Sequence, residues 1–178
     1  MYTGILLYPR FSEYELSVLL SILKQGRKPI VLIGLDKDAV KGEAGLACIP
    51  DVRVEEVDVE ALDSIVLPGV DDFQHLDRHP SLISFLGKFR NKNVWIGAIS
   101  SAPYFLAMSG LLDGKKYTTG LTSEQRSFLD TFNNATLIEA PVVVDGKLIT
   151  ARGSHFIEFA IKIGEALDLD FDRSRYKH

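Results

Sequence analysis

Ser100 has the surroundings that a nucleophile requires. It follows an apolar run rich in β-branched residues, 94–99, and precedes a segment in which apolar side chains recur at helical spacing. A strand that reverses directly into a helix leaves room only for small side chains two positions to either side of the turn, where this chain has Ala98 and Ala102. The pattern predicts a nucleophile elbow, with Ser100 in strained backbone geometry at the N-terminus of a helix.

The residues after Ser100 indicate which charge such a turn would favour. Pro103 suits the first turn of a helix, where a backbone N–H would lack a partner. Unpaired amides at this end of a helix favour a developing negative charge. The alternative is an ordinary tight turn in which Ser100 or Ser101 serves only as a helix cap.

A second chemical group, the carboxyl of Glu15, follows the first expected strand, residues 4–8. The helix after that strand is expected to begin at Ser12 as N-cap and to end at Gly26. In one interpretation Glu15 is the acid of a capping box with Ser12. In the other it points into the crevice at the carboxyl end of a parallel sheet, where ligands bind.

The elements that must position these groups alternate between strand and helix patterns, which predicts a single α/β domain over residues 1–178. Between them, residues 39–59 are expected to form a small hairpin and an irregular return. The expected strands are 4–8, 28–34, 63–67, 94–100, a short one at 117–119 and a hairpin at 142–150 around Asp145-Gly146. The expected helices are 12–26, 80–89, 103–108, 123–132 with Phe128, Leu129 and Phe132 on its apolar side, and a last one with Phe156, Phe159, Ile163 and Leu167 inward, before a frayed tail from Asp168.

Composition limits the class of protein. Hydrophobic residues make up 46% of the chain and charged residues 25%, which is typical of a globular domain. The net charge of −4 gives no reason to expect a nucleic-acid partner, and no apolar run is long enough to span a membrane. Cys48 is the one cysteine, so it is expected to be a small buried hydrophobe. Because no signal peptide precedes the first strand, a cytoplasmic location is expected.

The histidines give little indication of a metal site. His75 and His79 are four residues apart, but no third ligand accompanies them, so a solvated helix end is the preferred interpretation. His155 lies where the last helix is expected to begin. No metal and no cofactor are expected.

Several of these features occur in an order that resembles the ThiJ/PfpI superfamily. They are Phe11 to Glu15 after the first strand, Pro68-Gly69, the elbow at 98–103, Thr118-Thr119, and a Val-Asp-Gly hairpin leading into Thr150-Ala151-Arg152-Gly153. The resemblance implies a class I glutamine amidotransferase-like, flavodoxin-like fold. That fold is a three-layer sandwich with a mostly parallel sheet and helices on both faces, and family members are usually homodimers.

The resemblance also implies roles for individual residues. The reactive cysteine of the family falls at Ser100, and the acid that hydrogen-bonds to it falls at Glu15. The oxyanion amides fall at Val70, just after Gly69, and at Ser101. Many members carry a histidine at one of two positions, which here are Ser101 and Gly120, so both histidines are missing.

These departures favour a protein that has kept its pocket and lost its catalysis. A serine hydroxyl needs a positioned base, and an unperturbed carboxylate with a pKa of about 4.3 is a poor one. In this first hypothesis the site binds a small carbonyl or carboxylate ligand, or serves a regulatory partner. Its hydrogen bonds come from Ser100, the amides of Val70 and Ser101, and a protonated Glu15, beside the Arg152 segment.

The second hypothesis is a serine-dependent hydrolase acting on esters, amides or peptides. It requires a base from a position that the family does not use, and His155, two residues after Gly153, is the best candidate. The alternative for His155 is a partly exposed residue at a helix start. Residual glyoxalase-like or peptidase-like activity, and a Ser100 engineered in place of a natural cysteine, also stay open.

Overall fold

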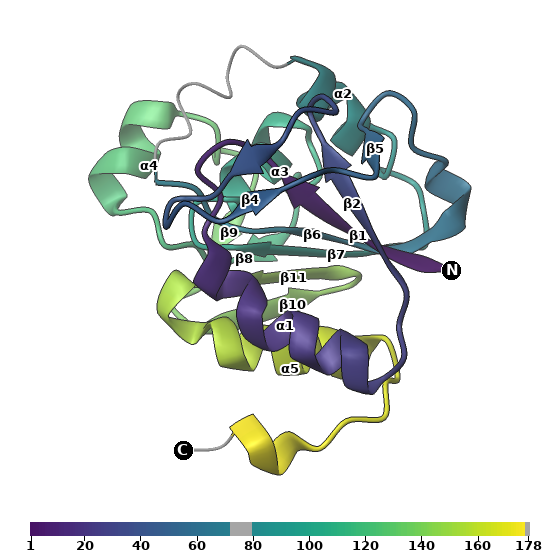
Figure 1. Cartoon of the computed structure of the whole chain (residues 1–178). Helices are drawn as coiled ribbons and strands as arrows, with labels where there is room; N and C mark the ends of the chain where they lie inside the picture. Colours follow the sequence, from purple (N-terminus) through teal and green to yellow (C-terminus); the bar gives the residue numbers. More distant parts are fainter. Residues whose placement is uncertain (72–79, 177–178) are drawn as a thin grey trace.

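The structure is a computed structural model that describes residues 1–71 and 80–176 (Figure 1). His75 and His79, which the sequence assigned to a solvated helix end, lie outside the described residues. Within the described ranges, no helix has the length and apolar character needed to cross a membrane.

Seven strands form one sheet in the order β10-β11-β7-β6-β1-β2-β5. Neighbouring strands are parallel except for the antiparallel pair β10 and β11. Their bounds are Tyr2–Leu7 (β1), Ile30–Gly34 (β2), Val52–Arg53 (β5), Leu62–Leu67 (β6), Trp95–Ile99 (β7), Val142–Asp145 (β10) and Leu148–Ala151 (β11). Counted along the chain, β1, β2, β6, β7 and β11 lie in the order 2-1-3-4-5, which is the order of the flavodoxin-like fold that the family resemblance implied.

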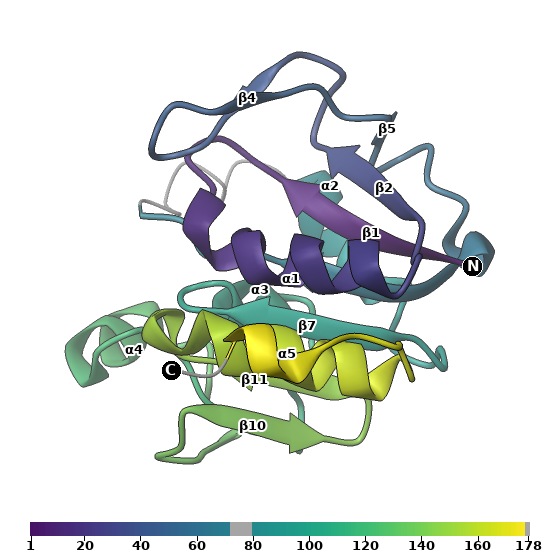
Figure 2. The ribbon, with the colours of Figure 1, turned by 60° about the horizontal axis from the view of Figure 1, so that its bottom comes forward.

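Helices cover both faces of this sheet. Helices α1, Glu13–Gln25, and α5, Phe156–Ala166, lie side by side on one face, while α2, Pro80–Gly87, and α3, Pro103–Met108, lie on the other (Figures 1 and 2). The predicted three-layer sandwich is therefore present. Helix α5 approaches β7 closely because Gly97 has no side chain: a Cβ atom there would lie 2.7 Å from Ile163 Cδ1.

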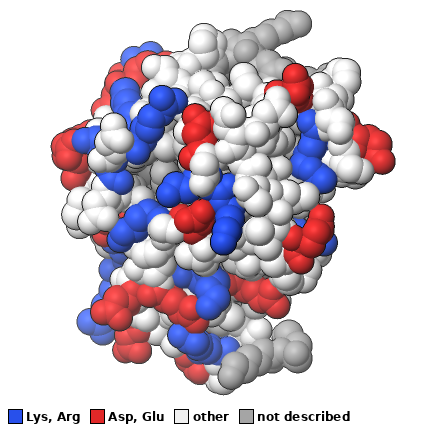
Figure 3. Space-filling view, turned by 180° about the vertical axis from the view of Figure 1, so that it is seen from behind, with Lys and Arg blue, Asp and Glu red and all other residues white. Residues whose placement is uncertain are grey.

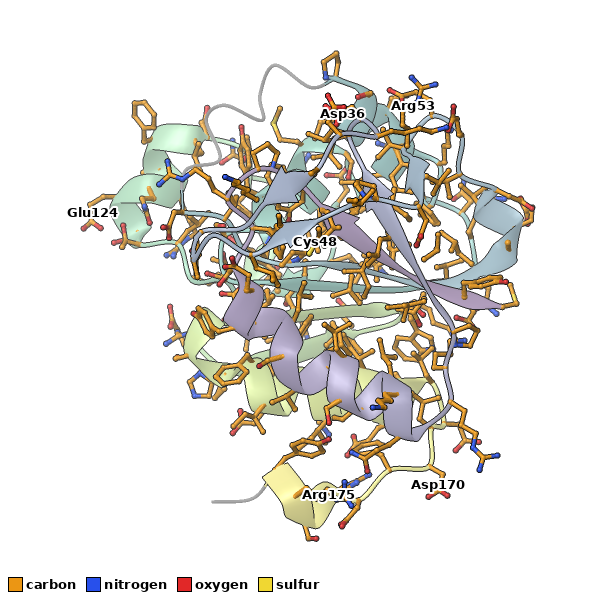
Figure 4. The ribbon with its side chains drawn as sticks, in the orientation of Figure 1. Asp36, Cys48, Arg53, Glu124, Asp170 and Arg175 are labelled. Atoms are coloured by element: carbon orange, nitrogen blue, oxygen red, sulfur yellow. The ribbon has the colours of Figure 1, made fainter. Side chains whose placement is uncertain are left out.

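Smaller elements lie around the sheet. The expected hairpin within residues 39–59 is formed by β3, Val40–Lys41, and β4, Ala47–Cys48. Cys48 lies on β4 of this hairpin (Figure 4), and its side chain is half-buried against the core, less buried than the sequence predicted. The remaining elements are η1 (Val59–Ala61), β8 (Lys116–Tyr117), α4 (Ser123–Leu129), β9 (Thr136–Leu137), η3 (Gly153–His155) and η4 (Arg173–Tyr176). A short strand was expected at 117–119, but β8 ends at Tyr117, so Thr118 and Thr119 lie outside it.

The helix expected over 123–132 ends earlier than predicted, and of its predicted apolar side Leu129 and Phe132 pack against the core but Phe128 does not. A capping box between Thr122 and Gln125 fixes the start of α4, and Asp130 ends it with a left-handed backbone, φ 49°. This geometry leaves Phe128 in solvent, 79% exposed. Phe132, beyond the helix, is buried and stacks on Tyr117 with ring centroids 5.0 Å apart.

The tail, residues 168–176, packs against the body of the molecule, so the prediction of a frayed segment from Asp168 is wrong over that range. Its apolar side chains occupy spaces left open by two glycines, Gly26 at the C-cap of α1 and Gly164 within α5. A Cβ atom at Gly26 would lie 2.8 Å from Leu169, and one at Gly164 would lie 2.6 Å from Phe171. These contacts hold the tail against α1 and α5, next to which it runs in Figure 1.

Surface charges of both signs are interspersed. Figure 3 shows lysines and arginines lying among acidic side chains on the face opposite to that of Figure 1. Ion pairs on the described surface include Lys92 with Glu60 and Lys162 with Glu165. The charges on this face therefore offset one another locally.

Candidate functional site

The predicted elbow is present at the end of β7. Ser100 has a left-handed backbone, φ 61°, which costs a non-glycine residue free energy and is typical of a functional turn. Ala98 and Ala102, two positions to either side, are fully buried. The backbone of Ser100 is fixed because its N–H donates to the Ala151 carbonyl, 2.9 Å, and its carbonyl accepts from the Gly120 N–H, 2.8 Å.

The elbow serines do not cap the helix that follows. Ala102 is the N-cap residue of α3, and no side chain makes a capping hydrogen bond there. Pro103 occupies the first turn, as predicted. The alternative interpretation, in which Ser100 or Ser101 served only as a cap, is therefore wrong.

Glu15 belongs to the site and not to a capping box. The hydroxyl of Ser12, the N-cap residue of α1, donates to Glu43 Oε1 at 2.7 Å and makes no cap bond. The Glu15 side chain is buried, and its Oε2 accepts from the Gly69 N–H at 2.6 Å. The N-terminus of α1 thus supplies a carboxyl group to the carboxyl ends of the strands.

Burial changes the acidity of this carboxyl group. It raises the pKa of Glu15 to about 7, against hydrogen bonds from the Gly69 amide and the Ser100 hydroxyl that favour the charged form. The unperturbed pKa expected from the sequence is therefore wrong. At neutral pH the carboxyl group is poised between its neutral and charged forms.

Glycines allow Ser100 and Glu15 to meet. A Cβ atom at Gly153 would lie 2.8 Å from Glu15 Oε1 and 3.0 Å from Ser100 Oγ. One at Gly69 would lie 2.7 Å from both Glu15 Oε2 and Ser100 Cβ. Side chains at these two positions would separate the hydroxyl from the carboxyl group.

The amide predicted to face an oxyanion is already occupied. The Val70 N–H donates to Ser101 Oγ at 3.0 Å, and this hydroxyl donates in turn to the Val70 carbonyl at 2.9 Å. Both residues are buried. The expectation that Val70 offers its amide to a ligand is therefore wrong for this structure, because the Ser101 side chain has taken that place.

Gly120 lies directly against the elbow. A Cβ atom at this position would lie 3.1 Å from Ser100 Oγ. A histidine there would touch the hydroxyl, so the resemblance pointed to the right place for a base. Glycine leaves the hydroxyl without one from this position.

A polar cavity of about 580 Å³ opens at Ser100. Arg152 lines it and forms an ion pair with Glu139, while Arg126 reaches it from α4. Its other lining residues are Tyr14, Ser100, Thr119, Gly120, Leu121, Ser123, Leu137, Gly153 and Ser154. Sequence reasoning missed Arg126 and Glu139, because a charged residue on an amphipathic helix or in a loop is usually a solvated one.

His155 is not brought to the hydroxyl. It lies in η3, partly exposed, with its Nδ1 3.0 Å from Ser154 Oγ. Ser154 lines the cavity, whereas His155 is not among the described residues that do so. In residues 1–71 and 80–176 no three His, Cys, Asp or Glu side chains gather in a way that could hold a metal ion.

Comparison with known proteins identifies the family. The chain matches the DJ-1/PfpI family over residues 4–166, which is most of its length. The chain belongs to the DJ-1/PfpI family. The ThiJ/PfpI resemblance and the flavodoxin-like fold expected from the sequence are thereby confirmed.

Relatives within the DJ-1/PfpI family carry different names. The uncharacterized protease YoaZ of Bacillus subtilis is 29% identical, over 93% of this chain and 84% of its own. Protein dj-1beta of Drosophila melanogaster is 31% identical, over 92% and 87%. Deglycase TK1284 of Thermococcus kodakarensis is 26% identical, over 80% and 84%. These names do not agree on one reaction, so membership of the family does not by itself fix an activity.

Solved structures support the same DJ-1/PfpI assignment. A mutant of the DJ-1 superfamily protein STM1931 from Salmonella typhimurium matches with a TM-score of 0.80 and 27% identity. The match covers 93% of this chain and 89% of that one. Within this fold, the Ser100 site combines a hydroxyl on a strained backbone turn, a buried carboxyl group beside it and two arginines, groups that can donate and accept hydrogen bonds.

Proposed function

We propose that this DJ-1/PfpI protein binds a small carbonyl- or carboxylate-bearing molecule at Ser100 without forming a covalent bond to it. One observation carries the proposal: the hydroxyl of Ser101 occupies the Val70 amide that would otherwise stabilise an oxyanion. With the Val70 amide taken, only the Ser101 amide is left of the two predicted donors, and acyl transfer loses part of what is usually its largest stabilisation. In this proposal Ser100 stands where the family has its reactive cysteine.

The proposed binding uses the hydroxyl and the carboxyl group as a pair. With a pKa of about 7, Glu15 is partly protonated at neutral pH. Its neutral form donates a hydrogen bond, and its charged form accepts the one that Ser100 donates. Glu15 is buried and does not itself line the cavity, so in this proposal it acts through the Ser100 hydroxyl, which it sets as a donor or as an acceptor toward the ligand.

A serine-dependent hydrolase is the second candidate, and one observation favours it. Ser100 hydrogen-bonds to a carboxyl group whose pKa lies near 7, which suits a general base far better than an ordinary glutamate. His155, the base first expected, does not line the cavity in the described structure. The hydrolase therefore depends on Glu15.

A fluorophosphonate probe distinguishes the two candidates, since it labels only an activated serine. We expect the intact mass of the wild type to stay unchanged after incubation, as does that of the Ser100→Ala variant. A stoichiometric adduct on the wild type, absent from Ser100→Ala, would contradict the proposal and establish the hydrolase. The Ser100→Cys variant controls for access, because iodoacetamide should alkylate the new thiol if the site is open.

The assembly and location that the family resemblance implies also belong to the proposal. We expect a homodimer in the cytoplasm, with a small-molecule ligand as the partner of the site. A regulatory partner protein is the other occupant that this non-catalytic role allows.

A further inference from the structure

We infer that the ligand carries a carboxylate, which Arg126 and Arg152 bind in the same cavity that holds Ser100. This inference rests on the proposed binding function and narrows its ligand from carbonyl or carboxylate compounds to small carboxylic acids. It goes beyond the family assignment, because it depends on α4 and on an ion pair at the cavity rim.

The cavity has an excess of positive charge. Arg126, Arg152 and Glu139 are the charged residues among its described lining, so one positive charge is left over. The remaining polar groups of the lining include the hydroxyls of Ser123 and Ser154, which donate or accept hydrogen bonds. An anionic ligand would therefore balance the excess positive charge of the lining residues, and their polar side chains could hydrogen-bond to it.

Arg126 is fixed at the cavity wall. Its Nη1 donates to the Leu121 carbonyl at 2.6 Å, which uses one of the five N–H donors of a guanidinium. Because α4 is anchored by the capping box at Thr122, the helix holds this arginine in place. A fixed guanidinium loses little conformational entropy on binding an anion.

The hydrogen-bonding groups of Arg152 are only partly satisfied by the described residues. Its Nη2 pairs with Glu139 Oε2, while its Nε is buried and has no hydrogen-bond partner among the described residues. A buried donor without an acceptor costs free energy. A guanidinium in this state gains from a carboxylate that accepts from Nε and Nη2 together, the bidentate geometry that arginine favours.

The carboxylate of Glu139 occupies the position at Arg152 that the carboxylate of the ligand would take. Its side chain is 72% exposed, so the pair with Arg152 is a surface ion pair, which contributes little to stability. A carboxylate that enters the cavity can take its place at Arg152 with little loss. Glu139 therefore competes with the ligand, and removing its charge should strengthen binding.

In this inference the ligand contacts Ser100 and the arginines at the same time. Ser100 and Arg152 line one cavity of about 580 Å³, which has room for a small acid. A 2-oxo acid would place its carbonyl oxygen at the Ser100 hydroxyl and its carboxylate at the arginines. The matched amide of the same acid would keep the first contact and lose the second.

Titration calorimetry with pyruvate and pyruvamide tests this, because the two differ chiefly in the carboxylate. We expect the wild type to bind pyruvate at least tenfold more tightly than pyruvamide. Arg152→Gln and Arg126→Gln should each weaken pyruvate binding about tenfold and leave pyruvamide unchanged, whereas Glu139→Gln should tighten pyruvate binding several-fold. Arg53→Gln is the matched control, since Arg53 forms a comparable exposed ion pair with Glu56 outside the cavity.

The other possible results of the calorimetry each contradict one part of the inference. Equal binding of pyruvate and pyruvamide would overturn the carboxylate inference and leave the proposed binding function standing. Binding of neither compound would overturn both. Weaker pyruvate binding by Glu139→Gln would show that Glu139 supports the site instead of competing for it. If Arg152→Gln does not fold, Arg152→Lys tests the same point, because it keeps the charge and loses the planar fork.

Discussion

The carboxyl group of Glu15 couples the stability of the fold to pH. Its pKa is about 7 in the folded chain, against a reference value of 4.5. Between these values the folded protein keeps a proton that the unfolded chain releases, so stability falls as pH rises through this window. The shift corresponds to a loss on the order of 3 kcal/mol between pH 4.5 and pH 7.

The Glu15→Gln variant should remove this pH dependence. Glutamine keeps an acceptor for the Gly69 N–H and cannot ionise. We therefore expect the wild-type melting temperature to decrease from pH 5 to pH 8, and that of Glu15→Gln to change much less. Glu158→Gln, at an exposed position in the first turn of α5, is the control and should keep the wild-type slope. Equal slopes for wild type and Glu15→Gln would contradict the shifted pKa.

Ser101 is the second residue whose neighbours determine its role. Ser101→Ala removes both hydrogen bonds to Val70 and leaves a buried N–H without its acceptor. We expect a loss of about 1–3 kcal/mol in the free energy of unfolding, measured by urea denaturation. Ser17→Ala, which removes an exposed hydroxyl bonded to the Tyr14 carbonyl, should change it by less than about 0.5 kcal/mol. A Ser101→Ala protein as stable as the wild type would show that this hydroxyl does not hold the loop to the elbow.

At the scale of elements, α4 brings a charged residue to the cavity while exposing an aromatic one. Arg126 lines the cavity, and Phe128, two positions later, is in solvent. Glu124 of the same helix also points away from the body of the molecule in Figure 4. The capping box and the left-handed Asp130 set this orientation, since they fix where the helix begins and ends.

A pair of substitutions tests this orientation. Phe132→Ala removes a buried ring that stacks on Tyr117, so we expect a loss of roughly 3–5 kcal/mol in the free energy of unfolding. Phe128→Ala removes an exposed ring and should change it by less than about 0.5 kcal/mol. Denaturation of both variants in urea measures the difference. Similar losses for both would mean that Phe128 is buried in solution, by the fold or by a partner.

At the scale of the whole molecule, topology explains why these residues meet. The strand order reverses beside β1, and in such sheets ligands bind at the carboxyl ends of the strands next to that point. Glu15 follows β1, Gly69 follows β6 and Ser100 follows β7, three strands that lie side by side. The flavodoxin-like strand order therefore brings Glu15, Gly69 and Ser100 together. Helix α4 then supplies part of the cavity wall beside them.

Assembly is the prediction that belongs to this scale. The family resemblance implies a homodimer, so we expect light scattering after size exclusion to give twice the chain mass. The result should not depend on dilution into the low micromolar range. A mass equal to one chain would contradict the dimer and would leave the Ser100 site, which the single chain forms by itself, unaffected.

The sequence was sufficient for the features that neighbouring residues encode. The alternation of strand and helix patterns predicted an α/β domain, and the small residues around Ser100 predicted the elbow, because both depend on side chains a few positions apart. It failed at Phe128 and at the tail after Asp168. At both places the local sequence pattern did not determine whether the apolar side chains are buried or exposed, and packing against distant elements decided it.

The chemistry of the site was decided only by the tertiary structure. Glu15 accepts from an amide 54 positions away, and Ser101 binds an amide 31 positions away, so neither contact has a local signal. A pKa depends on burial and on the groups that surround the carboxyl group, whatever part of the chain supplies them. The sequence by itself therefore determined the fold and the place of the site. The folded chain determined that Glu15 titrates near neutrality, that the Val70 amide is occupied, and that two arginines share a cavity with Ser100.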